Sequence, residues 1–255
     1  MLAGMGAGAI NAAVGSGTLI TFPVLLALGF APVTANISNN IGLVPGGMAG
    51  AWGYRRELGG RRPDLTRLIP CSALGGAAGA ILLLQLPADA FKKIVPVLIA
   101  IALVLVVSQP WLAARMTRRP VPAQGSEPAR DSVPVRGLGL GLMLGTVGAG
   151  MYGGYFGAAQ GVLMIGLLGW LLTDSLQIAN GLKNVLVSVV NGVAALTFLI
   201  VAPDRVNWVV VLLIAAGSTL GGVLGANLGR RLPPRVLRGL IVVVGLIAIV
   251  RLVVG

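Results

Sequence analysis

An internal duplication constrains this 255-residue chain more than any other feature of its sequence. Short motifs of the first half return in the second half at a fixed offset of 144 positions: Gly4-x-Gly6 returns at Gly148-x-Gly150, Gly17-x-Leu19 at Gly161-x-Leu163, and Ala35-Asn36 at Ala179-Asn180. After an insertion of two residues, Leu74-Gly75-Gly76 returns as Leu220-Gly221-Gly222, and Leu86-Pro87 as Leu232-Pro233. A duplicated apolar chain with amides at matched positions is typical of membrane carriers that hold a substrate between their halves.

The composition indicates an integral membrane protein. Hydrophobic residues make up 56% of the chain and charged residues 10%, which implies several spans of about 20 apolar residues. The net charge of +12 would also suit a nucleic-acid binder, but the basic residues gather in the connections between apolar stretches. This placement is typical of cytoplasmic loops in membrane proteins. We therefore expect the lipid bilayer, and no nucleic acid, as a partner.

The reactive side chains of the chain are too few for a metal or covalent catalytic centre. The sequence has no histidine and one cysteine, Cys71, so zinc sites and Cys/His nucleophile pairs cannot be assembled within one chain. All seven acidic residues lie at connections or span ends. We therefore expect no cofactor, no metal and no catalytic residue, and we do not interpret the chain as an enzyme.

Each half of the chain contains four apolar stretches. They cover residues 2–31, 33–54, 65–86 and 90–114 in the first half, and 137–173, 176–202, 206–229 and 235–254 in the second. The first stretch of each half is too long and too rich in glycine for one plain helix. The first copy is interrupted by Gly15-Ser16-Gly17 and Pro23, and the second by Gly153-Gly154, Gly157 and Gly161. We predict that each is a hairpin of two short helices that enter and leave the membrane on the same side.

The distribution of arginines predicts how these stretches cross the membrane. If residues 55–67 lie inside the cell, the three helices around them also place the basic residues of 115–136 inside. The arginines of 230–238 then fall inside only if 137–173 is a hairpin. The prediction is an all-α integral membrane protein of two inverted-topology repeats, each an interrupted helical hairpin plus three transmembrane helices. Its parts are a first repeat (1–115), a cytoplasmic linker (116–135) and a second repeat (136–255), with both termini outside.

One charged side chain lies well inside an apolar span. Lys183 falls about two turns into the stretch 176–202, and its repeat partner is Asn39. A lysine at the centre of a membrane helix costs about 2.5 to 3.5 kcal/mol on insertion scales, so it is usually paired, functional or extended toward the interface. Because no carboxylate lies within the spans, a substrate anion is the expected partner. The alternative is that the lysine stem reaches the near interface.

Amides surround Lys183 along one face of its predicted helix. Their spacing of three and four residues forms a polar stripe that consists of Gln177, Asn180, Asn184, Ser188 and Asn191. The first half has a shorter version, Asn36, Ser38, Asn39 and Asn40. Amide and hydroxyl groups can replace the water around an oxyanion, or they can simply hydrogen-bond between helices. For the duplicated pairs Asn36/Asn180 and Asn40/Asn184 we predict substrate binding.

The interrupted hairpins offer a second source of positive potential. A helix that starts at mid-depth after Gly17 or Gly161 turns its positive end, and backbone amides without intrahelical acceptors, toward the centre. The polar side chains nearest the breaks are Ser16, Thr18, Tyr152, Tyr155 and Gln160. The predicted substrate site consists of Lys183, Asn36, Asn40, Asn180, Asn184, Asn39, Ser16, Gly17, Thr18, Gln160, Gly161, Tyr152, Ser188 and Asn191.

Glycine pairs four residues apart predict close helix contacts. They are Gly75 to Gly79, Gly221 to Gly225, and Gly137 to Gly141 to Gly145. Such runs let two helix backbones approach closely. We expect them to pack within the bundle, and we leave open that one of them forms the face of a homodimer.

The motifs of both repeats resemble one family. The stretch Tyr152-Gly-Gly-Tyr-Phe-Gly-Ala-Ala-Gln-Gly161, followed by Asn180-Gly-x-Lys183-Asn184, resembles the second-repeat signature of the TauE/SafE family, the sulfite exporter group of anion permeases. In the first repeat, Gly15-Ser-Gly-Thr-Leu-Ile-Thr-Phe-Pro23 is similar to the glycine-rich loop and proline of that family. The first loop here is Gly-Ser-Gly where the family usually has three glycines, so Ser16 adds a hydroxyl.

The resemblance implies export or exchange of small anions, such as sulfite, sulfonates or related organic acids, across a bacterial inner membrane. Taken alone, the residues indicate only a small anion-like substrate. We therefore expect a secondary transporter that works by alternating access. The alternatives are an anion channel and a structural or accessory membrane protein whose polar stripe only joins helices.

Overall fold

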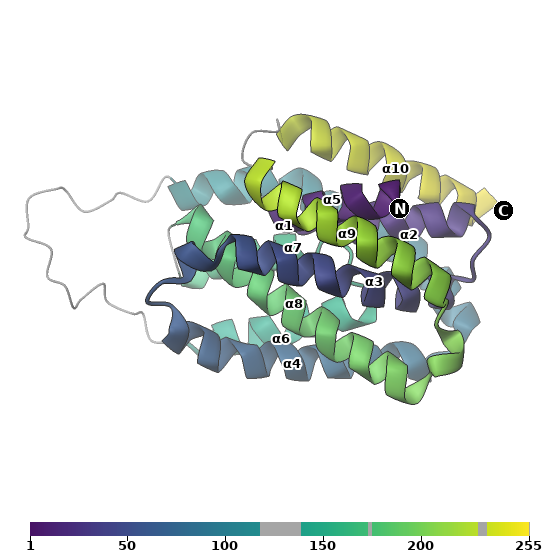
Figure 1. Cartoon of the computed structure of the whole chain (residues 1–255), viewed down its shortest axis with the longest axis horizontal. Helices are drawn as coiled ribbons and strands as arrows, with labels where there is room; N and C mark the ends of the chain where they lie inside the picture. Colours follow the sequence, from purple (N-terminus) through teal and green to yellow (C-terminus); the bar gives the residue numbers. More distant parts are fainter. Residues whose placement is uncertain (118–138, 173–174, 229–233, 255) are drawn as a thin grey trace, which may run out of the picture.

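The protein is an all-helical bundle in the part of the chain that the computed structural model describes, residues 1–117, 139–172, 175–228 and 234–254 (Figure 1). The helices of the first half are α1 (Leu2–Ala13), α2 (Thr18–Ala27), α3 (Pro32–Gly53), the short 3₁₀ helix η1 (Arg55–Leu58), α4 (Arg62–Gln85) and α5 (Ala88–Thr117). Those of the second half are α6 (Leu140–Tyr155), α7 (Gln160–Leu171), α8 (Leu176–Val201), η2 (Pro203–Arg205), α9 (Trp208–Leu228) and α10 (Pro234–Val254). Of the predicted linker, 116–135, the structure describes only the first two residues.

Four of the described helices are long and apolar enough to cross a membrane. They are the segments Arg62–Gln85, Asp89–Trp111, Leu176–Val201 and Trp208–Gly225. Helix α3 has 22 residues, but its three asparagines lower its hydropathy. In α10 the apolar described segment is the shorter Ile241–Val250. The expected all-α fold is therefore confirmed for the described residues, and four of the six predicted full spans are supported by length and composition, which is consistent with an integral membrane protein.

The surface of the bundle has the character of a protein that faces lipid. Large apolar side chains lie exposed on the outward faces of the long helices, for example Val104 on α5 at 68% and Leu212 on α9 at 66%. Soluble proteins rarely expose contiguous apolar surface of this kind. All four tryptophans are also exposed within two turns of a helix end: Trp52, Trp111, Trp170 and Trp208. Tryptophans in this position are typical of the membrane interface.

Both predicted hairpins are present, with sharper breaks than expected. Helix α1 ends at Ala13 and α2 begins at Thr18, while α6 ends at Tyr155 and α7 begins at Gln160. The repeat partners Gly15 and Ala159 turn the chain with left-handed φ values of 82° and 59°. Gly157 also lies in the second break, as predicted, with a φ of 78°. Four other predicted interruptions are wrong, because Pro23 lies inside α2, Gly153 and Gly154 inside α6, and Gly161 inside α7.

The two hairpins open toward opposite ends of the bundle. Helix α2 leads into the turn at Ala31, which lines a shallow depression together with Pro87 and Arg205 from two other turns. Helix α7 instead ends at Leu171 and Leu172, in an apolar cluster with Leu58 of η1. In Figure 1 the α3–α4 connection lies at the left, and the α2–α3 and α8–α9 connections lie at the right.

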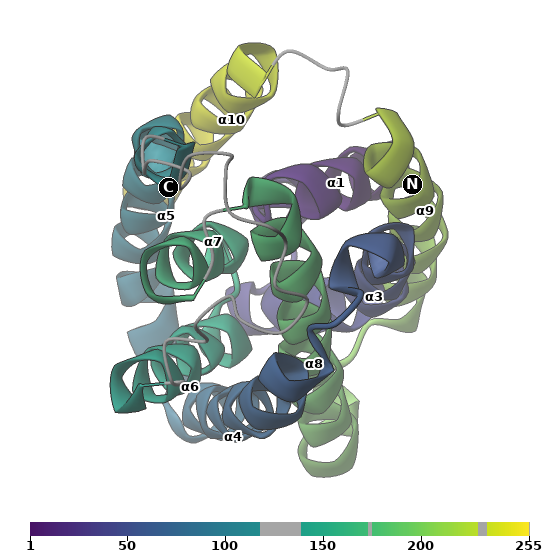
Figure 2. The same ribbon diagram turned by 90° about the vertical axis from the view of Figure 1, so that its left-hand side faces the viewer.

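Matching helices of the two halves make matching contacts. Helix α4 packs along α6, and its counterpart α9 packs along α1. Glycines allow this approach: a Cβ added at Gly79 would meet the carbonyl of Met151, and one added at Gly221 would meet that of Met5. The predicted helix-contact role of the runs Gly75 to Gly79 and Gly221 to Gly225 is thus confirmed. Figure 2 shows α8 crossing the middle of the bundle, with α5 and α10 side by side at its edge.

Candidate functional site

The turns of the two hairpins meet in the interior of the bundle. The amide of Gly161 donates a hydrogen bond of 3.1 Å to the carbonyl of Gly15. A Cβ on either glycine would collide with the backbone of the other, so this approach requires glycine at both positions. Beside it, the rings of Phe22 and Phe156 meet edge to face with centroids 5.3 Å apart. The two halves therefore touch through main chain at this point.

Lys183 lies fully buried against the first hairpin. Its Nζ donates two hydrogen bonds of 3.1 Å, to the carbonyl oxygens of Asn11 and Ala12, and the Asn184 amide donates a third bond of 3.3 Å to Ala12. These carbonyls lie at the C-terminal, negative end of α1, where a cation is stabilised. No carboxylate among the described residues bonds to Lys183. Because Lys183 is 0% exposed, the alternative in which its stem reaches the interface is wrong.

Asn39, the repeat partner of Lys183, contacts α2. Its amide nitrogen donates to Thr18 at 3.4 Å, and the Thr21 hydroxyl donates to its carbonyl oxygen. In the second half the positions that match these threonines are Val162 and Ile165 on α7. Because these side chains carry no polar group, Lys183 bonds the end of α1 instead. The two repeats thus differ in charge at one equivalent position.

Asn36 bonds the end of α6 as Lys183 bonds the end of α1. Its amide donates a 2.9 Å hydrogen bond to the carbonyl of Tyr155, the last residue of α6. Tyr155 is the repeat partner of Asn11. In each hairpin, the end of the first helix is therefore capped by a side chain from the opposite half. Further along, Asn40 donates to Asn191 at 3.4 Å across α3 and α8.

One matched pair of buried polar side chains at the hairpin turns has no hydrogen-bonding partner among the described residues. They are Ser16, 0% exposed, and its repeat partner Gln160, 1% exposed. The Gln160 side chain lies over Gly153, where a Cβ would collide with it. A buried polar group without a partner costs about 1 to 3 kcal/mol. Retention of two such groups at matched positions points to a ligand or water that bonds them.

The backbone amides at the start of α7 are already bonded. Gln160 donates to Gly157 at 3.4 Å, Gly161 to Gly15 at 3.1 Å and Val162 to Ala159 at 3.0 Å. As expected, none of these acceptors lies within α7, but the turn and Gly15 supply acceptors in their place, so these amides are not free to bind an anion. The helix still directs its positive end at the turn. The groups left to bind a ligand here are side chains.

Two predicted site residues bond locally, and the carbonyl oxygen of a third is unbonded. The Ser188 hydroxyl donates to the carbonyl of Asn184 in its own helix, and the Tyr152 hydroxyl donates to Ala158 within its own hairpin. Asn180 is half-buried, with a carbonyl oxygen that has no partner in the described structure. The remaining predicted residues converge on the hairpin turns or on the contact of Asn40 with Asn191. We call Ser16, Gln160, Lys183, Asn36, Asn39 and Asn184 the central site.

Sequence reasoning missed four partners of the central site. The carbonyls of Asn11, Ala12 and Tyr155 have no side-chain signature, because any residue type can supply a backbone acceptor. Thr21 had a signal, since it follows Thr18 by three residues and shares its helix face.

Apolar outer faces, helices that end in exposed tryptophan and a polar centre buried between two hairpins define an integral membrane protein with an internal polar site. The model of the family described as "Sulfite exporter TauE/SafE" matches residues 1–252. The chain therefore belongs to the TauE/SafE family of membrane transporters.

Two relatives carry names that agree with this class. A "probable membrane transporter protein" of Haemophilus influenzae is 27% identical over 244 residues, which cover 96% of this chain and 89% of that protein. The "probable membrane transporter protein YfcA" of Escherichia coli K12 is 25% identical over 242 residues, which cover 93% of this chain and 82% of that protein. No solved structure matches the chain.

Proposed function

We propose that the protein is a secondary transporter, an exporter or exchanger, that moves small anions such as sulfite, sulfonates or related organic acids across the bacterial inner membrane by alternating access. The substrate binds at the central site between the hairpin turns. The observation that carries this proposal is the pair of buried, unpartnered side chains Ser16 and Gln160 at matched positions near the buried ammonium of Lys183.

The charge balance of the central site supports an anion. Lys183 brings a positive charge, and its two acceptors are neutral carbonyls that supply only partial negative charge. An ammonium has three protons, and the carbonyls take two of them, which leaves one for a substrate oxygen. The lysine stem passes close to the turn at Gly161, since a Cβ added there would lie 3.0 Å from the Lys183 Cδ.

The packing supports two inverted repeats as the moving parts. The hairpins open toward opposite ends, and matching helices pair across the halves. Inverted repeats of this kind exchange roles when a carrier changes its open side. The proposed orientation places the arginine-rich turn at residues 55–67 and the linker 116–135 in the cytoplasm, with both termini outside.

A transport assay on reconstituted protein tests the role of Lys183. Vesicles are loaded with sulfite, and efflux is compared between wild type and Lys183→Gln. Glutamine keeps an N–H donor for the end of α1 but removes the charge, so we expect the variant to insert and fold while sulfite flux falls to background. Arg62→Gln, which removes one exposed positive charge, serves as the control and keeps wild-type flux.

The same assay separates a carrier from a channel. A carrier saturates with substrate and shows counterflow, whereas a pore conducts without either. Normal flux in a folded Lys183→Gln variant would contradict the assigned site. Flux of no tested sulfur oxyanion, sulfonate or carboxylate by the wild type would contradict the proposed function and favour an accessory membrane protein.

A further inference from the structure

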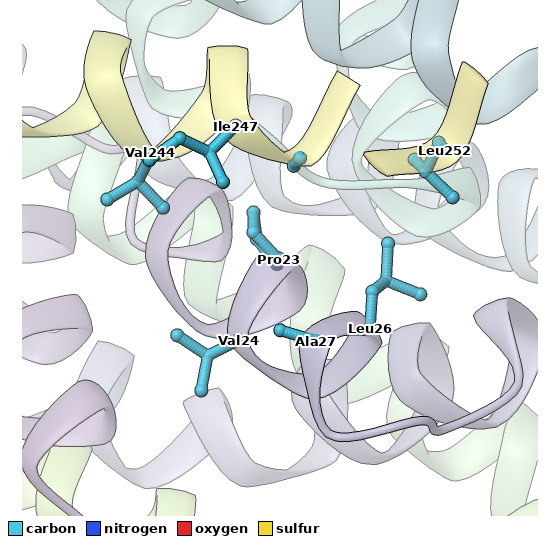
Figure 3. A pocket seen from close by; sticks show the side chains of 8 residues that line it. Pro23, Val24, Leu26, Ala27, Val244, Ile247 and Leu252 are labelled. Atoms are coloured by element: carbon cyan, nitrogen blue, oxygen red, sulfur yellow. The ribbon is translucent and has the colours of Figure 1, made fainter. Parts of the chain in front are cut away.

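An apolar groove lies between the neighbouring helices α2 and α10 on the outer surface of the bundle. Its volume is about 490 Å³, which is within the range of small-ligand sites. Figure 3 shows Val244, Ile247 and Leu252 of α10 facing Pro23 and Leu26 of α2. Every residue that lines the groove is apolar. The groove therefore suits a hydrocarbon chain and offers nothing to a polar solute.

A basic depression continues this groove. It is lined by Asp89, Lys92, Lys93 and Pro96 of α5, and by Leu252, which also lines the groove. Both lysines are exposed. With one carboxylate and two ammonium groups, the depression carries a net positive charge. A charged entrance and an apolar interior are thus joined at one residue.

The basic depression and the apolar groove follow one another along the bundle in the order of a phospholipid headgroup and its acyl chain. Lys92 and Lys93 lie within the first two turns of α5, at the end of the bundle that also carries the turn at Pro87. From Leu252 the groove extends to Val244, eight residues along α10, which is about 12 Å at 1.5 Å per residue. A headgroup at the lysines would therefore place its acyl chain in the groove.

The position of the lysines is unusual for their charge. This end of the bundle is opposite the arginine-rich turn 55–67, and basic residues are depleted on the side away from such a turn. Apart from Lys183, these two residues are the only lysines of the chain. Asp89 in the same depression can balance one of the two charges, which leaves one positive charge for a negative partner.

We propose that this surface binds one anionic phospholipid, with its phosphate at Lys92 and Lys93 and an acyl chain in the groove between α2 and α10. The bound lipid joins the first hairpin to the peripheral helix α10. Because α2 also follows the turn that carries Ser16, the lipid braces the hairpin from the outside.

Native mass spectrometry of the full-length protein tests this proposal. The protein is reconstituted with vesicles of equal parts phosphatidylglycerol and phosphatidylcholine, extracted in mild detergent, and its retained lipids are counted. We expect one retained phosphatidylglycerol in preference to phosphatidylcholine. Lys92→Gln/Lys93→Gln should reduce this preference about tenfold, since each lysine near a membrane surface contributes to binding anionic lipid.

Matched variants separate the site from general adsorption. Ala27→Phe fills the groove and should lower retention of both lipids, whereas Ala216→Phe, at an exposed position of α9, should leave it unchanged. Arg56→Gln/Arg62→Gln removes the same charge at the opposite end and should also leave it unchanged. Equal retention of the two lipids by wild type, equal losses in the arginine and lysine variants, or a lysine-dependent dimer in place of bound lipid would each overturn the proposal.

Discussion

At the scale of single residues, the central site combines bonded and unbonded polar groups. Lys183, Asn184 and Asn36 bond the carbonyl ends of α1 and α6, so these side chains hold the hairpins in place. The side chains of Ser16 and Gln160 are buried but make no hydrogen bond to a described residue. We therefore propose that the first group positions the hairpins, with Lys183 also offering its charge and third proton to the substrate, and that Ser16 and Gln160 act in binding alone.

Replacement of Gln160 by methionine separates stability from function. Methionine has a similar length and no polar atom, so Gln160→Met should raise the free energy of unfolding by about 1 to 3 kcal/mol in the absence of substrate. It should also abolish any stabilisation of the protein by sulfite. Thermal unfolding in detergent, with and without sulfite, measures both effects.

The exposed Gln177 provides the control for this experiment. Gln177→Met should leave both the stability and the effect of sulfite unchanged. A destabilised Gln160→Met protein would show that this amide is bonded within the fold. A Gln160→Met protein that still responds to sulfite as wild type does would contradict its role in binding.

At the scale of elements, the helices pair through glycines at matched positions. A Cβ at Gly79 would collide with the carbonyl of Met151, and one at Gly225 would lie 2.6 Å from Ala9. Helices α4 and α6, and helices α1 and α9, therefore approach closely without side chains between them. In lipid, where no hydrophobic force drives helices together, such close packing is a main source of association.

Valine at Gly79 should separate α4 from α6. We expect Gly79→Val to lower the unfolding temperature strongly and to reduce the yield of folded protein, because the obstructing atoms are backbone and cannot move aside. Gly141→Val, in α6, has open space at the Cβ position and should be tolerated. Size-exclusion profiles and thermal unfolding distinguish the two; similar behaviour of both variants would contradict the glycine contact.

The elements could be predicted from sequence more fully than the site. Apolar length, the glycine-rich breaks and the arginine clusters predict both hairpins and the long helices within a few residues of their observed bounds. The sequence also places Lys183 well inside a span, but left open whether its stem reaches the interface, which its full burial decides. The acceptors of Lys183 could not be predicted, because they are backbone carbonyls at the end of a helix whose position depends on the packing of the other half.

At the scale of the whole molecule, the two halves surround a polar centre from opposite directions. Each hairpin reaches the interior from one end of the bundle, and the third helix of each half, α3 or α8, supplies the amides that meet it. The single difference in charge, Lys183 against Asn39, makes the two sides of the centre unequal.

Cysteine labelling tests the orientation of the halves. Cys71 is the single cysteine and is buried, so a Cys71→Ser background accepts reporter cysteines at the exposed positions Gly60 and Asp204. With a membrane-impermeant maleimide on intact spheroplasts, we expect Asp204→Cys to react at once. Gly60→Cys should react only after the membrane is permeabilised. The reverse pattern, or equal labelling of both positions, would contradict the proposed topology.

The contact between Gly15 and Gly161 has a consequence for leakage. Backbone meets backbone there, and the neighbouring rings of Phe22 and Phe156 fill the adjacent space. We expect such a seam to exclude a continuous file of water molecules, along which protons would otherwise cross. A transporter closed in this way leaves the proton gradient of its cell intact in the absence of substrate.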